Sequence, residues 1–135
     1  MGQRIARTWE RFKQGLGDGD FEAAIEAIEA AVMALKEHYG SELLSVMLFG
    51  SLARGNKGYD DIDLLIVIAN ERGPAGELTR NLAQSVFGPL FLDTGQLFSF
   101  LLYSETQLKA LKGFLPLFDE IREDRIVLHG SDPFA

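Results

Sequence analysis

Two short apolar runs with a polar loop between them restrict the fold of this chain more than any other feature of its sequence. The first runs from Leu43 to Phe49 and ends at Gly50-Ser51, and the second runs from Asp61 to Ile68. Apolar runs of this length, bounded by glycine and other turn-forming residues, are typical of buried β-strands. The sequence therefore predicts two strands inside a sheet, with residues 55–60 in the loop between them.

The second run carries two carboxylates near its start, Asp61 and Asp63. Side chains alternate between the two faces of a strand, so these carboxylates share one face, with their Cα atoms roughly 6–7 Å apart. Ile62 and Leu64 then point the other way, into the core. Paired carboxylates bind hard cations such as Mg²⁺, and without a cation they repel each other and resist burial. We predict a metal site at Asp61 and Asp63; the alternative is an exposed pair on an edge strand.

The turn after the first run has the composition of a phosphate-binding loop. Gly50 lets the backbone approach a ligand closely, and Ser51 is expected to cap a helix that begins at Leu52. The free amide groups at such a helix start, with the Ser51 hydroxyl, are suited to binding phosphate, and Arg54 or Lys57 adds positive charge. A metal site beside this loop suits attack on the α-phosphorus of a nucleoside triphosphate, with pyrophosphate leaving.

The rest of the chain predicts helices that alternate with strands. Apolar stripes, caps and turn residues place helices over residues 5–16, 21–39, 74–87, 105–111 and 115–121, and two more strands over 96–103 and 126–128. We expect Asp18 or Asp20 to cap the second helix, Gly88-Pro89 to follow the third, and Ser104 with Gln107 to form a capping box. The pattern predicts an α+β domain over residues 20–135, with helices packed on a small mixed sheet. Residues 1–19 are expected to form an extra N-terminal helix, packed on the domain or on a partner.

Composition excludes several classes of function. The chain has 135 residues, 47% of them apolar, which is enough for one domain with its own core. A net charge of -7 leaves no broad basic surface for an extended nucleic-acid duplex, and the absence of cysteine excludes disulfides and thiolate metal sites. No apolar stretch approaches the roughly 20 residues of a membrane span, and the N-terminus lacks an apolar signal region. We expect a cytoplasmic protein.

Leu48 to Gly55 followed by Asp60 to Ile66 resembles the signature of the minimal nucleotidyltransferases in the DNA polymerase beta superfamily. The signature itself covers residues 46–68, and a looser likeness extends to residue 130. The resemblance implies the nucleotidyltransferase fold, Gly50 and Ser51 as the triphosphate-binding pair, and Asp61 and Asp63 as the first two metal carboxylates. It implies a nucleoside triphosphate, expected to be ATP, with one or two Mg²⁺ ions. It also implies a HEPN-type helical partner protein, in some cases a toxin that an antitoxin of this kind adenylylates.

Two positions depart from the family pattern. Asp60 replaces the serine that usually precedes the first metal aspartate, and Ser99 aligns with the third carboxylate of the family, with Asp93 as the nearest upstream acid. The sequence therefore leaves two functions open. One is a nucleotidyltransferase that transfers a nucleoside monophosphate to a hydroxyl of a small molecule or a partner protein. The other is an antitoxin-like module that binds nucleotide, Mg²⁺ or a partner without catalysis. The sequence does not determine the oligomeric state, and a dimer is one of the alternatives.

Overall fold

The structure is a computed structural model that describes residues 7–16, 21–70 and 75–135. Its strands are β1 (Arg7–Thr8), β2 (Leu43–Phe49), β3 (Ile62–Ile68), β4 (Phe98–Ser104) and β5 (Ile126–Gly130). Its helices are α1 (Trp9–Leu16), α2 (Glu22–Tyr39), the short η2 (Gly40–Glu42), α3 (Gly50–Ala53), α4 (Ala75–Leu82), the π-helical η3 (Ala83–Phe87), α5 (Gly88–Thr94), α6 (Glu105–Leu111) and α7 (Pro116–Asp124). None of the described helices is both long and apolar enough to cross a membrane.

The strands form one mixed sheet in the order β1-β5-β2-β3-β4. Strand β2 is antiparallel to both β3 and β5, whereas β4 runs parallel to β3 and β1 parallel to β5. The apolar run of β3 is buried on both faces of the sheet, as expected for a strand with neighbours on both sides and helices above and below. The predicted α+β fold with a small mixed sheet is confirmed.

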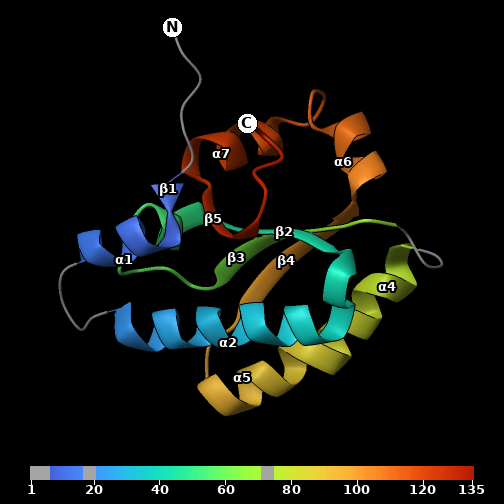
Figure 1. The fold of residues 1–135 in the computed structure, drawn as a ribbon. Helices are drawn as coiled ribbons and strands as arrows, with labels where there is room; N and C mark the ends of the chain where they lie inside the picture. The colour runs from blue at the N-terminus through green and yellow to red at the C-terminus, as the bar shows by residue number, and fades with distance from the viewer. Residues whose placement is uncertain (1–6, 17–20, 71–74) are drawn as a thin grey trace, which may run out of the picture.

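Helices cover both faces of the sheet, and each face has its own apolar core. Even-numbered residues of β3, such as Ile62 and Leu64, pack with α2, η3 and α5. Odd-numbered residues such as Leu65 and Val67 pack with α6, α7 and the C-terminal Phe134. Figure 1 shows α2 and α5 on one side of the sheet and α6 and α7 on the other. Asp63 therefore belongs to the face of α6 and α7, and its apolar neighbours face the other core, as the alternation predicts.

The N-terminal helix is shorter than its apolar stripe predicts. Arg7 and Thr8 form strand β1 beside β5, and α1 begins only at Trp9; Ile5, the first residue of the predicted stripe, lies outside the described residues. Phe12 is buried in the core under α2, and the Trp9 indole N–H donates to Glu29 of α2 at 3.2 Å. At Arg7 and Thr8, backbone pairing with β5 therefore replaces the predicted helical conformation.

The predicted end of the third helix at Gly88-Pro89 is wrong. The helical path continues through η3 into α5 and ends at Gly95, which has φ +72°. Before the proline, the Gly88 N–H bonds to the Ala83 carbonyl, five residues back, as in a π-turn. Pro89 falls in the first turn of α5, the part of a helix in which proline is tolerated. The chain therefore passes the proline without leaving the helical path.

Two of the helix starts predicted from capping residues, those of α2 and α6, have different outcomes. The capping box before α6 is confirmed, because the Gln107 N–H donates to the Ser104 hydroxyl and the Ser104 N–H to the Gln107 side chain. The candidate caps Asp18 and Asp20 lie outside the described residues. Phe21 immediately precedes α2 and makes no side-chain capping bond.

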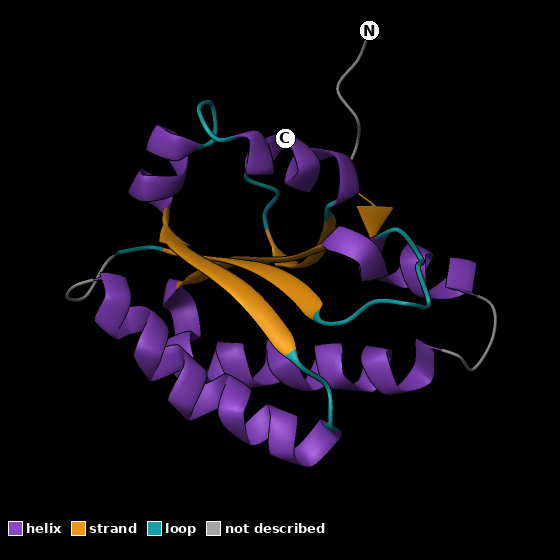
Figure 2. Ribbon diagram, turned by 180° about the vertical axis from the view of Figure 1, so that it is seen from behind, coloured by secondary structure: helices purple, strands orange, loops and turns teal. Residues whose placement is uncertain are grey.

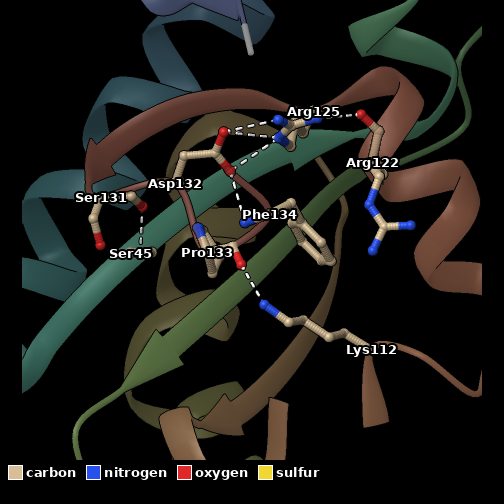
Figure 3. A network of polar contacts seen from close by, with 8 residues as sticks. All are labelled: Ser45, Lys112, Arg122, Arg125, Ser131, Asp132, Pro133 and Phe134. Carbon is tan, nitrogen blue, oxygen red and sulfur yellow. Dashed lines mark hydrogen bonds and ion pairs between the residues drawn. The ribbon is translucent and has the colours of Figure 1, made fainter. Parts of the chain in front are cut away.

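A polar network holds the C-terminal segment over β2 (Figure 3). The Arg125 side chain is 2% exposed and forms an ion pair with Asp132 at 2.9 Å, and it also donates to the Arg122 carbonyl. The Ser45 hydroxyl donates to the Ser131 carbonyl at 2.6 Å. These bonds hold Phe134 against the core of the α6–α7 face.

Candidate active site

The two motifs predicted from the sequence meet at one end of the β2–β3 pair. Strand β2 ends at Phe49, directly opposite Asp63 of the antiparallel β3. The chain enters the short helix α3 at Gly50, so the Gly50-Ser51 turn lies against the start of β3. Asp61 precedes β3 by one residue, and both carboxylates are half-buried. The register of the two strands thus brings the loop and the carboxylates together.

Gly50 is in direct contact with the carboxylate of Asp63. Its φ of +79° lies in the region that disfavours side chains, and a Cβ atom at this position would overlap Oδ2 of Asp63. Both the backbone conformation and the close approach therefore require glycine here. The sequence predicts that Gly50 allows a ligand to approach; the structure adds that this residue makes room for the second carboxylate.

The ionised form of the Asp63 carboxyl is disfavoured at this position. Burial first, and then the neighbouring charge of Asp61, raise the pKa of the Asp63 carboxyl from its ordinary 3.8 to about 6. The positive charge of Arg54 acts in the opposite direction but does not compensate. A divalent cation between the two carboxylates would remove this penalty, because it favours the charged form of both. The residues at this position therefore fit a hard metal ion held by Asp61 and Asp63.

Ser51 lies inside helix α3, whereas the sequence predicted that it would precede the helix as its cap. It is the second residue of a four-residue helix that starts at Gly50, Phe49 occupies the cap position, and no side-chain capping bond forms. The prediction that Ser51 caps a helix beginning at Leu52 is therefore wrong. The backbone carbonyl of Ser51 accepts from Arg54 and Asn56, which closes the turn. Contact between its hydroxyl and phosphate stays a prediction.

Arg54 forms an ion pair with Asp124, at the end of α7, with 2.5 Å between guanidinium and carboxylate. The Arg54 side chain is 55% exposed and Asp124 is 14% exposed, so the arginine retains an open side for a ligand. Sequence reasoning missed Asp124, because 70 residues separate the two partners and no local pattern links them. The predicted contact of Arg54 with nucleotide remains a prediction.

Ser99, the residue that the sequence resemblance aligns with a third carboxylate, lies beside Asp63. Strand β4 runs parallel to β3 in a register that pairs Asp63 with Ser99, so the two side chains emerge on the same face. Asp93 lies in the last turn of α5, which packs on the opposite face of the sheet with α2. Within the described part of the chain, no group of three acidic or histidine side chains is arranged to hold a metal. Asp93 therefore does not complete the pair.

Comparison with known proteins agrees with this fold. A sequence profile of the nucleotidyltransferase domain matches residues 28–112, and the chain belongs to this family. One similar solved structure is a mutant form of the toxin-antitoxin complex MntA-HpeT, at 16% identity and a TM-score of 0.51, with a match that covers 77% of this chain and 73% of that one.

A second similar structure is a Sulfolobus solfataricus protein described provisionally as a nucleotidyltransferase. It shares 20% identity and a TM-score of 0.50, and the match covers 84% of this chain and 91% of that one. Among curated proteins, none is similar enough in sequence to match. At these identities the two structures establish the fold alone.

Proposed function

We propose that this protein transfers a nucleoside monophosphate from a nucleoside triphosphate to a hydroxyl group of a small molecule or a partner protein. The nucleoside monophosphate that we propose is AMP. In this proposal Asp61 and Asp63 hold Mg²⁺, and Gly50, Ser51 and Arg54 bind the triphosphate. Bound Mg²⁺ would supply charge neutralisation at the phosphorus under attack and at the leaving pyrophosphate. The chain's own residues hold the cation beside the phosphate loop and orient the triphosphate along it.

The observation that carries the proposal is the β2–β3 register, which packs Gly50 against the Asp63 carboxylate. A structural domain has no use for two half-buried carboxylates at a strand end, because their repulsion and desolvation lower stability. A metal–triphosphate site gives both the carboxylates and the glycine a role. Membership of the nucleotidyltransferase domain family supports the same chemistry.

The second candidate is an antitoxin-like module that binds nucleotide, Mg²⁺ or a helical partner of the HEPN type without transferring a nucleotide. The neutral Ser99 beside Asp63 favours it, because no carboxylate stands there to take the proton of an attacking hydroxyl. The similar MntA-HpeT structure is of a toxin-antitoxin complex, which supports a partner protein for this chain as well.

Labelled ATP separates the two candidates. The protein is incubated with ATP labelled at the α-phosphate and Mg²⁺, alone and with the product of the neighbouring gene, and label on an acceptor is measured. Transfer that disappears in Asp61→Ala supports the enzyme. Metal-dependent ATP binding without transfer under both conditions supports the binding module. ATP binding that is unchanged in both Asp61→Ala and Asp63→Ala contradicts the metal site itself.

A further inference from the structure

The two borders of the sheet differ in a way that nucleotide transfer does not explain. At one border, β1 has only two residues and the chain turns at once into α1. At the other border, β4 has seven residues and pairs only with β3 among the described strands. Its register with β3 is regular over all seven positions, whereas β2 has register shifts on both sides. Figure 2 shows β4 as a long strand at the border of the sheet.

The register identifies which backbone groups of β4 point out of the sheet. The Ile62 N–H donates to the Leu97 carbonyl at 2.8 Å, and Ile62 pairs with Phe98. In a parallel ladder, alternate residues turn their N–H and C=O toward the same neighbour, so Leu97, Ser99, Leu101 and Tyr103 face β3. The backbone groups of Phe98, Phe100 and Leu102 face outward, and no strand in the described part of the chain pairs with them.

This border lacks the features that usually protect an edge strand. The segment from Phe98 to Ser104 contains no charged residue and no proline, and its apolar side chains are only half-buried. Three neighbouring apolar side chains are exposed, Phe91 at 47%, Leu92 at 84% and Leu97 at 55%. Lysines, prolines, bulges or covering helices normally block such an edge, and a long, flat, apolar edge is a template for another strand.

We propose that β4 pairs with β4 of a second copy of this chain, antiparallel across a two-fold axis, and joins the two sheets into one. Each outward N–H and C=O of one strand then meets its counterpart on the other. The chain carries a net charge of -7, so two copies approach with least repulsion through a segment without charges, and β4 is such a segment. Pairing of a strand with itself closes the assembly, whereas pairing of β4 with β1 of another copy would leave open ends.

The proposed dimer also fixes where the two candidate active sites lie. Strand β3 is next to β4, so the Asp63–Ser99 pair lies one strand away from the seam. A two-fold axis perpendicular to a continuous sheet keeps the same face of both copies on one side. Both sites therefore open on the same side of the dimer. The inference rests on the unpaired border and uncharged composition of β4, and it holds whether or not the protein transfers nucleotides.

The test measures mass and amide protection on the full chain. Size-exclusion chromatography with light scattering is run between about 1 and about 100 μM, because a dimer depends on protein concentration. We expect twice the 15.0 kDa mass of one chain at the upper end. Amide hydrogen exchange at Phe100 and Leu102 should slow at least about tenfold on dimerisation. Exchange at Leu101, whose N–H faces β3, serves as the internal control.

Two leucine-to-lysine variants locate the interface. Leu101→Lys places like charges near each other across the seam and should weaken dimerisation at least about tenfold. Leu101 also packs against the core of the α6–α7 face, so both variants are first checked for folding. Leu117→Lys, on α7 and 36% exposed, is the control away from the seam and should leave the dimer intact. A monomer at all concentrations overturns the proposal, and so does a dimer in which Phe100 and Leu102 exchange at the rate of unpaired amides. If Leu101→Lys does not fold by circular dichroism, exchange on the unaltered protein decides between these outcomes.

Discussion

Replacing Asp63 by asparagine should stabilise the metal-free protein. Burial and the charge of Asp61 raise the pKa of this carboxyl to about 6 from 3.8. At neutral pH the ionised form therefore costs folding stability, at most about 3 kcal/mol since one pKa unit is worth about 1.4 kcal/mol. The side chain is half-buried and partly solvated, so we expect Asp63→Asn to raise the free energy of unfolding by about 1 to 2 kcal/mol at pH 7.5.

The pH dependence gives the sign of this effect. The folded protein holds the Asp63 proton more tightly than the unfolded chain, so folding is favoured at low pH and loses stability as the pH rises from about 4 to about 6. The difference in unfolding free energy between Asp63→Asn and the unaltered protein should be smaller at pH 5 than at pH 7.5, by about 0.5 to 1 kcal/mol.

Urea denaturation followed by circular dichroism, with a chelator present, measures these differences. Asp60→Asn is the matched control; Asp60 is exposed in the same loop, and its replacement should change the free energy of unfolding by less than about 0.5 kcal/mol. Added Mg²⁺ should stabilise the unaltered protein and not Asp63→Asn. A less stable Asp63→Asn at pH 7.5 without metal would refute the account of burial and repulsion.

Three further changes test other parts of the structure. Gly50→Ala forces a Cβ onto the adjacent carboxylate at φ +79° and should cost about 2 to 4 kcal/mol in urea unfolding; a loss below about 0.5 kcal/mol would contradict the packing. Ser99→Asp places a third carboxylate in the site and should raise Mg²⁺-dependent label transfer from ATP at least about tenfold, and an unchanged rate counts against the assignment of this position. Asp132→Asn removes the ion pair between Asp132 and the buried Arg125 and should lower the free energy of unfolding by about 2 to 4 kcal/mol. Asp119→Asn, at an exposed ion pair, is the control and should lower it by less than about 0.5 kcal/mol. Equal losses in the two variants would mean that the C-terminal network contributes little to stability.

The local patterns of the sequence predicted most of the elements correctly. Strands β2 and β3, helix α2 and the capping box at Ser104 all follow from periodicity and capping over a few residues, where backbone geometry links neighbours directly. The fold class follows from the order of these elements. The prediction that Gly88-Pro89 ends a helix was wrong, because a π-turn ahead of Pro89 keeps the chain helical and places the proline in the first turn of α5.

The sequence by itself predicted which residues can form the site, since alternation along a strand over residues 61–68 would put Asp61 and Asp63 on one face. Tertiary structure decided what surrounds them. The β2–β3 register packs Gly50 on Asp63, and burial there raises the pKa of the carboxyl to about 6. Helix α7 brings Asp124 to Arg54 across 70 residues of chain. Such contacts depend on how distant elements pack and on how much water that packing excludes, and no local spacing encodes either quantity.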